Sequence, residues 1–521
     1  MNRAGRLARL LRILSVVIAE PGLNPLELAE RAGVSERTLR RDLVHLRELG
    51  YEVAYTGGYE MQETLNLEGR AGHRSLGRVY EQHLELLRNQ LPKRLAALGH
   101  RRGRFAGSGR PRLPVSNRHR AARSDFNGRA RSDCNGRARP GDQMKPIVLI
   151  PSGEGDADFT YATGFSVETG LYIRFGEGDD VLVTSPLEID RARVQSKTSR
   201  KLLLEEAGYE EAGPFDSYAH LATRMLGERH LDSALVSPRL QAGYLEALRA
   251  AGLRVEVDRE LFQAERRRKT AEEARFIEAS QRAAEAAVVE VVSQLAHADI
   301  RDGILWLDER PLTSEHLYAR ASLLLGEQGF VCPDMIIAGS PECAMPHFRG
   351  EGPIRAGAPV IIDIFPSSRT THYHGDLTRT VVVGEIPEEI RRMHAAVLQA
   401  LDAGIESIKA GVSGRDVHHA VCHVLVDRGY GTTTRGFEGA DGGARMNHST
   451  GHGVGLDVHE EPALRGPAEN PLLEGDVVTV EPGLYLLGLG GVRIEDTGMV
   501  TAGGFKNFTS LTRSLDPRDY L

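Results

Sequence analysis

The first 50 residues of the chain repeat apolar positions with the period of an α-helix. Within the segment 6–19, apolar side chains return every three or four residues, at Leu7, Leu10, Leu11, Leu14 and Val17. Asn24, followed by Pro25 and Glu27, has the order of a helix cap, a first helical residue and a capping-box partner. This order predicts a second helix that ends near Ala32.

A third helix is predicted over about residues 36–49, after a tight turn at Gly33-Val34. Ser35 is a favourable cap for it, and its inner face carries Leu39, Leu43 and Leu46. Two β-runs follow, at 51–55 and 59–61, on either side of Gly57-Gly58. Short β-runs around such a turn predict a β-hairpin.

The regular pattern is lost between residues 62 and 143. An amphipathic helix is predicted over about 76–91, and Pro92 ends it. From Arg101 to Pro140 there are 12 arginines, 2 aspartates and no lysine, without a hydrophobic period. Such a segment buries too little apolar surface to fold, so we expect it to be disordered. It also contains a tandem octamer that begins at Ala122 and again at Ala130.

Strands and helices alternate from Lys145 onward. The pattern predicts strands over 146–151, 171–175 and 180–185, helices near 192–207 and 218–226, a strand–helix unit over 233–251, and a long helix over about 265–298. The last third adds two pairs of β-runs, 358–365 with 376–384 and 477–480 with 491–500, separated by helices over 388–409 and 414–428. Because a single polar loop joins the first pair, it is expected to form a hairpin.

Charge separates the front of the chain from the rear. Residues 1–143 carry 27 Lys and Arg against 15 Asp and Glu, whereas the remainder carries 38 against 57. A basic front favours a polyanion as its partner. The four cysteines lie far apart, which argues against a disulfide framework or a zinc finger and favours a reducing compartment. Arg12 interrupts the apolar run Leu10–Ala19, which is also too short to span a bilayer, so we expect a cytoplasmic protein without membrane contact.

Two helices joined by a glycine-containing turn, with arginines at the start of the second, form a helix-turn-helix pattern. The stretch Pro25–Leu43, with the hairpin after it, resembles the winged helix-turn-helix of bacterial transcription regulators of the DeoR type. That resemblance implies contacts with DNA bases or phosphates by Ser35, Arg37, Thr38, Arg40 and Arg41. The alternative is a small helical bundle with a solvated basic face.

Three interpretations of the arginine-rich segment stay open. It is a basic arm that adds phosphate contacts, a passive linker, or translated DNA between two joined genes, with Met144 as the true start of the second protein. Arginine without lysine is typical of translated GC-rich sequence that is not under selection.

Five side chains of the metal-ligand type lie in the last third, at Asp363, Asp376, His452, Glu481 and Glu495. The first pair of β-runs carries the two aspartates and the second pair the two glutamates. Two divalent cations about 3–4 Å apart need carboxylates that bridge them. Four carboxylates and one imidazole suit Mn²⁺ or Co²⁺, with Zn²⁺ or Fe²⁺ as alternatives. We expect the glycines beside His452 to let the backbone approach a metal.

The surrounding motifs resemble the signature of the M24 metallopeptidases, which include methionine aminopeptidase, aminopeptidase P and prolidase. They are Asp363 itself, Gly-Asp376-Leu-Thr-Arg-Thr, Gly-His452-Gly-Val-Gly with His459-Glu, Glu481-Pro-Gly and Arg493-Ile-Glu495-Asp. The likeness spans about 144–521 and implies a creatinase-like N-terminal domain followed by a catalytic domain of the "pita-bread" fold. The loop between Asp363 and Asp376 is two residues longer than in many members, and Pro366 replaces the usual glycine segment; both bear on substrate preference.

By this resemblance, Asp363 holds one metal, His452 and Glu481 hold the other, and Asp376 and Glu495 bridge the two. Two cations lower the pKa of a water held between them. Glu481 is the expected general base and proton carrier.

Three further histidines, His347, His448 and His459, match the prolidase and aminopeptidase P branch. In that branch, histidines at such positions bind substrate and stabilise the tetrahedral intermediate, so His347 and His459 are expected to be catalytic as well. The alternative is that all three are loop histidines without a role.

Two more expectations concern the surroundings of the site. Arg493 shares a strand face with Glu495, so we expect it to orient that carboxylate and to contact substrate. His372 and His374, in the hairpin loop, are predicted to be surface residues.

These features predict a multidomain chain. Its expected parts are a winged helix-turn-helix (1–62), a helical extension (63–99), a disordered arginine-rich linker (100–143), a creatinase-like α/β domain (144–262) and an α+β pita-bread catalytic domain (263–521). The predicted function is an exopeptidase with two divalent metal ions that cleaves Xaa-Pro bonds of peptides and binds DNA through its front; the family likeness implies a homodimer. Alternatives are a transcription regulator whose rear senses a peptide or metal, a fusion of two adjacent genes, and a metal-free pseudoenzyme like creatinase.

Overall fold

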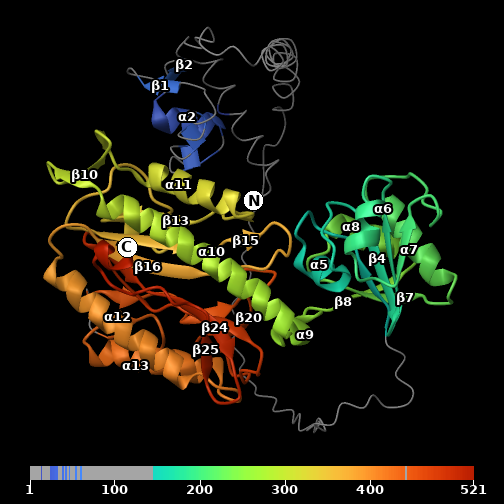
Figure 1. Ribbon diagram of the computed structural model, residues 1–521. Coiled ribbons are helices and arrows are strands. Elements are labelled where there is room, and N and C mark those ends of the chain that lie inside the picture. Colours follow the sequence, from blue (N-terminus) through green and yellow to red (C-terminus); the bar gives the residue numbers. More distant parts are fainter. Residues whose placement is uncertain are drawn as a thin grey trace, which may run out of the picture. The chain divides into compact units, whose positions relative to one another are not determined.

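The structure is a computed structural model of the chain (Figure 1). It describes residues 13, 24–32, 34, 38–39, 42–43, 46, 53–55, 59–61, 145–439 and 443–521. The helix predicted over 76–91 and the arginine-rich segment lie outside these residues. The chain divides into two compact units, residues 1–132 and 133–521, and each is described by itself. Among the described residues, no helix has both the length and the apolar character needed to cross a membrane.

The N-terminal unit contains the predicted capped helix and the predicted hairpin. Helix α2 spans Pro25–Ala32. The side-chain oxygen of Asn24 accepts hydrogen bonds from the N–H groups of Leu26 and Glu27, each at 3.0 Å, and the Glu27 carboxylate accepts from the Asn24 N–H at 3.1 Å. This is the predicted capping box. Strands β1 (Val53–Tyr55) and β2 (Tyr59–Met61) pair antiparallel, which confirms the hairpin.

The inner face of the third helix is also as predicted. Leu39, Leu43 and Leu46 are buried, together with Leu28 of α2. Ile13, which is absent from the predicted apolar face of the first helix, is fully buried, whereas the positions predicted for that face lie outside the described residues.

A six-stranded mixed sheet forms the first layer of the larger unit. Its elements are β3 (Ile147–Leu149), α5 (Ala157–Thr163), β4 (Leu171–Gly176), β5 (Asp179–Thr184), α6 (Ile189–Gln195), β6 (Arg200–Leu203), α7 (Asp216–Gly227), β7 (Ser233–Val236), α8 (Ala242–Ala250) and β8 (Arg254–Val257). The strand order is β6-β5-β4-β3-β7-β8. Helices α7 and α8 pack on one apolar face of the sheet, and α5 and α6 contribute to a second core.

The helix predicted over 192–207 is wrong beyond residue 195. Helix α6 ends at Gln195, and residues 200–203 form strand β6, which pairs in parallel with β5. At the turn, the Ser196 hydroxyl donates to the Thr163 carbonyl at 2.8 Å and accepts from the Thr198 N–H at 3.3 Å. A short apolar run such as Leu202–Leu204 fits a strand as well as a helix, and pairing with β5 decides for the strand.

The remaining residues, from α9 to the end of the chain, form the region that carries the candidate site. Its elements are α9 (Gln263–Arg267), α10 (Ala271–Ala296), β9 (Asp299–Arg301), β10 (Ile304–Leu307), β11 (Arg310–Pro311), α11 (Ser314–Glu327), β12 (Phe330–Val331), β13 (Ile336–Gly339), η1 (Glu342–Ala344), β14 (Pro359–Ile364), β15 (Ser367–Ser368), β16 (Leu377–Val382), α12 (Glu388–Ser407), α13 (Gly414–Asp427), β17 (Gly431–Thr432), β18 (Arg445–Met446), β19 (Gly451–Gly453), β20 (Glu460–Leu464), β21 (Val477–Val480), β22 (Gly483–Leu486), β23 (Gly490–Arg493), β24 (Asp496–Val500), β25 (Phe505–Asn507) and η2 (Pro517–Tyr520). The long helix predicted over 265–298 is thus two helices, because Thr270 and Glu273 form a capping box that starts α10 anew.

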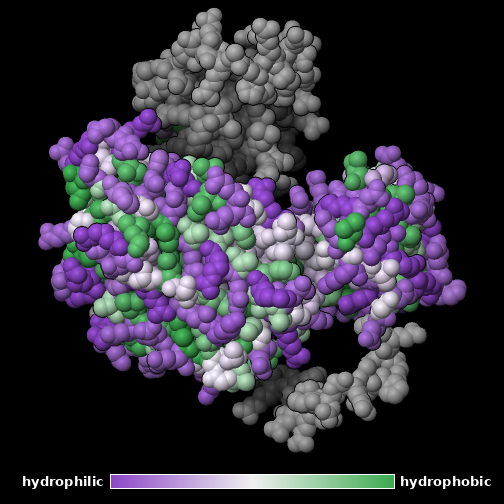
Figure 2. Space-filling model, viewed as in Figure 1, coloured by the Kyte–Doolittle hydropathy of each residue, from purple (hydrophilic) through white to green (hydrophobic). Residues whose placement is uncertain are grey.

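Two helix pairs enclose the strands of this region (Figure 1). Helices α10 and α11 pack on the sheet β13-β14-β16, and α12 and α13 pack on strands of the two sheets that contain β21, β22 and β23. On the face shown in Figure 2, hydrophobic residues of the described surface are interspersed with polar ones. The strands between these helix pairs bring segments that are far apart in the sequence together in the interior of this unit.

The predicted hairpin of β14 and β16 is present, with Asp363 opposite Thr378. Asp376 lies one residue before β16 and shares a face with Thr378, as expected from the alternation of a strand. The run predicted as one strand over 491–500 is two strands. β23 pairs with β22 and β24 pairs with β21, and the chain passes between these sheets at Ile494 and Glu495.

Candidate metal centre

All five predicted metal ligands line a single cavity of about 870 Å³. Asp363 stands within β14 and His452 within β19. The other three lie at strand ends, Asp376 just before β16, Glu481 just after β21 and Glu495 just before β24. Because these strands belong to two sheets that meet at the cavity, carboxylates separated by more than a hundred residues come together there.

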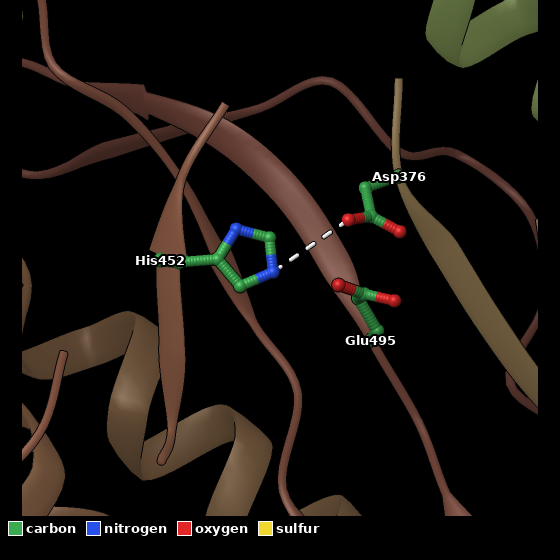
Figure 3. Close-up of side chains that lie close together, drawn as sticks. All are labelled: Asp376, His452 and Glu495. Atoms are coloured by element: carbon green, nitrogen blue, oxygen red, sulfur yellow. Dashed lines mark ion pairs between the residues drawn. The ribbon is translucent and has the colours of Figure 1, made fainter. Parts of the chain in front are cut away.

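The ring of His452 points toward the carboxylates of Asp376 and Glu495 (Figure 3). One ligand atom from each of these three residues lies within 4.8 Å of the other two. The His452 Nε2 atom is 3.7 Å from Asp376 Oδ2 and 3.6 Å from Glu481 Oε1. These separations are too long for hydrogen bonds.

Burial lowers the pKa of His452 to about 4, so the ring is neutral at pH 7. Its Nδ1 atom lies 3.2 Å from the Gly453 carbonyl, which can only accept, so the proton belongs on Nδ1. The Nε2 lone pair then faces the carboxylate oxygens. This is the tautomer in which histidine binds metals, with the second nitrogen held by a carbonyl.

The carboxylates of the cavity repel one another. Burial is the largest cause that raises the pKa of Asp376, followed by the charges of Glu495, Asp363 and Glu481. Burial also raises the pKa of Glu481 to about 8. Four acidic groups and the lone pair of a neutral imidazole therefore face a shared space, and a divalent cation there would offset their repulsion.

The spacing of the donor atoms fits such a cation. Two donors at about 2.1 Å from a tetrahedral metal lie about 3.4 Å apart, close to the separations between His452 Nε2 and its two carboxylate neighbours. The donor set of oxygens and one nitrogen is the type that binds divalent cations without thiolates. Asp376, His452 and Glu495 thus form a candidate metal site.

Arg493 contacts Asp363, which corrects the expectation that it orients Glu495. Its Nη2 atom is 2.6 Å from Asp363 Oδ2, and its Nε atom donates to the Thr378 hydroxyl at 3.3 Å. The Thr378 hydroxyl in turn donates to Glu495 Oε2 at 2.7 Å. Thr378 is therefore the direct partner of Glu495, and its carbonyl also accepts from the Glu495 N–H at 3.1 Å.

His448 has a protein partner on each ring nitrogen. Its Nδ1–H donates to the Ser449 carbonyl at 2.7 Å, and its Nε2 accepts from the Tyr485 hydroxyl at 2.8 Å. Burial raises the pKa of Tyr485 to about 12, so that hydroxyl keeps its proton, and its oxygen accepts from Arg493 Nη1 at 2.8 Å. His448 lines the cavity, but its nitrogens serve a hydrogen-bond chain that runs from Asp363 through Arg493 and Tyr485.

The two other predicted substrate histidines, His347 and His459, line the same cavity and are exposed. The rings of His459 and His452 pack edge to face with centroids 4.3 Å apart. His372 and His374 are half-buried, which corrects their prediction as surface residues. His374 is half-buried because its loop packs against the segment that follows His452. The backbone N–H of His374 donates there to the Gly455 carbonyl at 2.9 Å.

The glycines beside His452 serve strand packing. A Cβ atom on Gly451 would lie 2.1 Å from the Thr479 carbonyl oxygen, and one on Gly453 would lie 2.4 Å from the Glu461 carbonyl oxygen. Both glycines are thus required by the neighbouring backbones of β21 and of β20. The expected close approach of this backbone to a metal remains a prediction.

Four residues at or near the site were not predicted from the sequence. Asp158 and Arg266 line the cavity, Gln281 binds the backbone of Asp376, and Tyr485 belongs to the Arg493 chain. Asp158, Arg266 and Gln281 act through residues far away in the sequence, and Tyr485 contacts Arg493 eight residues later, on the neighbouring strand. None belongs to a short motif, so the sequence held no local signal for them.

Of the predicted DNA-binding residues, only Thr38 is among the described residues, where it is half-buried in the third helix. Ser35, Arg37, Arg40 and Arg41 lie outside the described residues. The contacts expected of them remain predictions.

Comparison with known families assigns both parts of the chain. Residues 275–502 match the profile of metallopeptidase family M24, and all five candidate ligands fall within that range. The chain carries an M24 domain. Residues 9–59 match the profile of an HTH domain, which confirms the expected helix-turn-helix in front of the M24 domain.

Curated relatives of the M24 domain include two named Xaa-Pro dipeptidase. The protein from Pyrococcus horikoshii is 38% identical over 183 residues, which are 35% of this chain and 48% of the relative. The protein from Pyrococcus furiosus is 32% identical over 250 residues, which are 47% of this chain and 64% of the relative. The matches thus span about half to two-thirds of these relatives.

A solved structure extends the likeness beyond the M24 domain. The crystal structure of the prolidase from Pyrococcus horikoshii OT3 is 26% identical, with a TM-score of 0.58, over 71% of this chain and 95% of that one. The expected pita-bread fold is therefore confirmed.

Proposed function

We propose that this chain is a metal-dependent exopeptidase that hydrolyses Xaa-Pro bonds and carries a DNA-binding domain at its front. The observation that supports it most is the arrangement of His452, whose unprotonated Nε2 faces the carboxylates of Asp376, Glu481 and Glu495 in one cavity. The relatives named Xaa-Pro dipeptidase support the substrate class. A prolidase and an aminopeptidase P are both consistent with the cavity.

Two divalent cations are proposed at the site, where Asp363, Asp376, His452, Glu481 and Glu495 would hold them. When bound, such a pair would lower the pKa of a water and polarise the carbonyl that is attacked. The oxygen-rich donor set favours Mn²⁺ or Co²⁺, with Zn²⁺ or Fe²⁺ as alternatives. Arg493 and Thr378 hold Asp363 and Glu495 in place through the contacts described above.

The protein groups carry the proton and hold the peptide. Glu481 is the proposed general base, because its carboxylate lines the cavity beside His452, where the attacking water is expected. It would take the proton of the attacking water and return it to the leaving proline nitrogen. His347, His459 and His448 are proposed to line the peptide site with Arg493, and His347 and His459 to donate hydrogen bonds to the oxygen of the tetrahedral intermediate.

The enzymatic proposal is tested with the full chain. After removal of metals, the protein is loaded with Mn²⁺ or Co²⁺ and given Xaa-Pro dipeptides, Xaa-Pro-Yaa tripeptides and matched peptides with alanine in place of proline. We expect cleavage of the proline peptides, loss of activity with EDTA and recovery on addition of metal. Cleavage of dipeptides alone would assign a prolidase, and cleavage of tripeptides an aminopeptidase P. If metal-loaded protein cleaves neither, the substrate class is wrong.

The front of the chain is proposed to bind DNA. The HTH profile match and the capped helix α2 with its hairpin support this proposal. Binding to a pool of random-sequence duplexes is expected to weaken when Arg40 and Arg41 are replaced by alanine and to fall steeply with salt. Equal binding by the variant would contradict the roles proposed for these arginines.

A second candidate function is a transcription regulator whose M24 domain senses a peptide or a metal. The presence of an HTH domain and an M24 domain in one chain favours it. The fusion of two adjacent genes at the arginine-rich segment is the alternative; an intact 57 kDa species in the native cell would exclude it, and an N-terminus at Met144 would support it. The domain limits given above, a homodimer and a cytoplasmic location complete the proposal.

A further inference from the structure

We propose that Arg266 is a positioning residue that fixes the segment carrying His459 by binding carboxylates on both sides of that histidine. This inference rests on the proposed function, in which His459 contacts the reacting peptide. Arg266 belongs to α9, the short helix between the six-stranded sheet and α10.

The guanidinium of Arg266 is buried among three carboxylates. Its Nη2 atom is 2.6 Å from Asp457 Oδ2 and 2.5 Å from Glu460 Oε2, and its Nη1 atom is 2.9 Å from Asp158 Oδ1. Asp457 lies two residues before His459 and Glu460 one residue after it. The side chain of Arg266 is 9% exposed, so these contacts are formed largely away from water, where charged hydrogen bonds are strong.

Other cations balance the same carboxylates. Arg239 binds Asp457 with both terminal nitrogens, at 2.9 and 2.5 Å, and Lys269 lies 2.6 Å from Glu460 Oε1. Ser237 also donates to Asp158 at 2.5 Å. Three cations therefore match three carboxylates, and Arg266 is the member that contacts all three acids.

The segment that Arg266 binds depends on such contacts for its shape. Residues 455–459 form bends between β19 and β20 and are not part of either strand. The segment also touches the proposed metal site, because the His459 ring packs on the His452 ring with centroids 4.3 Å apart. Displacement of Asp457 and Glu460 would thus move His459 relative to the five ligands.

Asp158 connects Arg266 to the region of the six-stranded sheet. It stands on α5, so the Arg266 guanidinium joins α5, α9 and the His459 segment at one point of the cavity wall. A purely structural role for Arg266 would stabilise these elements without acting through His459. The experiment must separate the two roles.

Arg267 provides a matched control for the test. It is the next residue on α9, its side chain is 13% exposed, and it binds the buried Asp476 with two hydrogen bonds at 2.9 and 2.7 Å. Arg266→Met and Arg267→Met both remove a largely buried arginine from the same helix and leave carboxylates behind. Only the first breaks contacts beside His459.

The kinetic test is a double-mutant cycle with full-length, metal-loaded protein. Arg266→Met is expected to lower kcat for an Xaa-Pro peptide by about 10²-fold with little change in KM, because a misplaced catalytic group costs about this much. In the His459→Ala background, the same substitution should lower kcat less than about twofold, since residues acting as one unit are not additive. Arg267→Met should cause the same small change in both backgrounds. An equal loss from Arg266→Met with and without His459 would overturn the inference.

An activity-independent readout separates this inference from the proposed function. Amide hydrogen exchange of residues 456–461 is expected to speed up in Arg266→Met and to stay at the wild-type rate in Arg267→Met. If the wild-type protein cleaves no Xaa-Pro peptide, the proposed function fails and the exchange rates still decide whether Arg266 holds this segment. If Arg266→Met does not fold, Arg266→Lys serves instead, because a compact ammonium lacks the rigid planar fork through which the guanidinium holds these carboxylates in fixed directions. Unchanged exchange and unchanged kcat in that variant would reject the positioning role.

Discussion

The side-chain amide of Gln281 binds the backbone of Asp376 at both of its polar groups. Gln281 Nε2 donates to the Asp376 carbonyl at 2.9 Å, and Gln281 Oε1 accepts from the Asp376 N–H at 2.9 Å. The side chain is fully buried on α10, and Gly375 allows this approach, since a Cβ there would lie 2.6 Å from the backbone of Gln281. Helix α10 thus holds a proposed bridging ligand in place at the residue before β16.

Gln281→Glu is therefore expected to weaken metal binding. The new carboxylate would face the Asp376 carbonyl where an N–H donor stood, so the backbone of Asp376 would shift. Loss of such an outer partner typically costs about 10–100-fold in metal affinity. Calorimetric titration of metal-free full-length protein with Mn²⁺ measures the change. Gln294→Glu, at a half-buried position further along the same helix and away from the cavity, is the control and should bind as the wild type does. Equal affinities for all three proteins would reject the role of Gln281.

The sequence predicted elements best where the pattern and the local chemistry agreed. The capping box of Asn24 and Glu27, the hairpin of β14 and β16 and the pair of helices after it all follow from local spacing. The strand over 491–500 was wrong as a single element. Its first half (β23) pairs with β22 and its second half (β24) with β21, and these two partners belong to different sheets.

The candidate site, too, was predicted correctly where local motifs marked it and wrongly where long-range contacts decide. Its carboxylates and His452 were found from residue type and motif, and the structure brings all five to one cavity. The partner of Arg493 was predicted wrongly. Strand alternation shows which side chains share a face of one strand, but it does not show that Asp363, 130 residues away, contacts Arg493. Gln281 and Arg266 act through contacts of this long-range kind, for which one sequence carries no pattern.

Gly451→Ala is expected to destabilise the protein. Its methyl group would be placed 2.1 Å from the Thr479 carbonyl oxygen, so β19 and β21 would have to separate beside His452. Overpacking of this kind typically costs about 1–3 kcal/mol. Thermal unfolding measures it, with Gly504→Ala as the control, because a Cβ on Gly504 meets no atom within 4 Å. Similar melting temperatures for the two variants would show that the strands yield more easily than the structure suggests.

The metal-free protein is expected to lose stability as the pH rises from 6.5 to 8. Burial raises the pKa of Glu481 to about 8 and also raises those of Asp376 and Glu495, so the folded state keeps protons that the unfolded chain releases near pH 4.5. Each such proton lowers the free energy of unfolding by about 1.4 kcal/mol per pH unit. His452 acts in the opposite direction, but only between its folded pKa of about 4 and its unfolded value of 6.5, so it does not interfere in this window.

Denaturant unfolding at a series of pH values, with and without Mn²⁺, tests this expectation. The cation should flatten the dependence, because it stabilises the ionised carboxylates, and it should stabilise the fold more at pH 8 than at pH 6.5. Glu481→Gln removes one of the protons and should reduce the slope of the metal-free protein. A metal-free protein whose stability is constant or rises over this window would contradict the proposed electrostatics of the cavity.

Asn24→Ala is expected to destabilise the N-terminal unit by about 1 kcal/mol, the usual cost of a lost helix cap. The substitution leaves the N–H groups of Leu26 and Glu27 without the oxygen that they bind now. Asn24→Asp retains an acceptor and should behave like the wild type. Amide exchange within α2 measures the effect locally; equal exchange in Asn24→Ala and Asn24→Asp would mean that the cap contributes nothing.

Glu481→Gln separates an enzyme from a sensor. The amide cannot accept the proton of the attacking water, so turnover of an Xaa-Pro peptide should fall by at least about 10²-fold, the usual contribution of a general base. Glu474→Gln, an exposed position shortly before β21, is the control and should retain full activity. Affinity for DNA should be the same in all three proteins, because the substitutions lie outside the HTH domain. A promoter response to Xaa-Pro peptide that persists in Glu481→Gln would favour the sensor. A response that disappears together with turnover would mean that the signal is the product of hydrolysis and not the bound peptide.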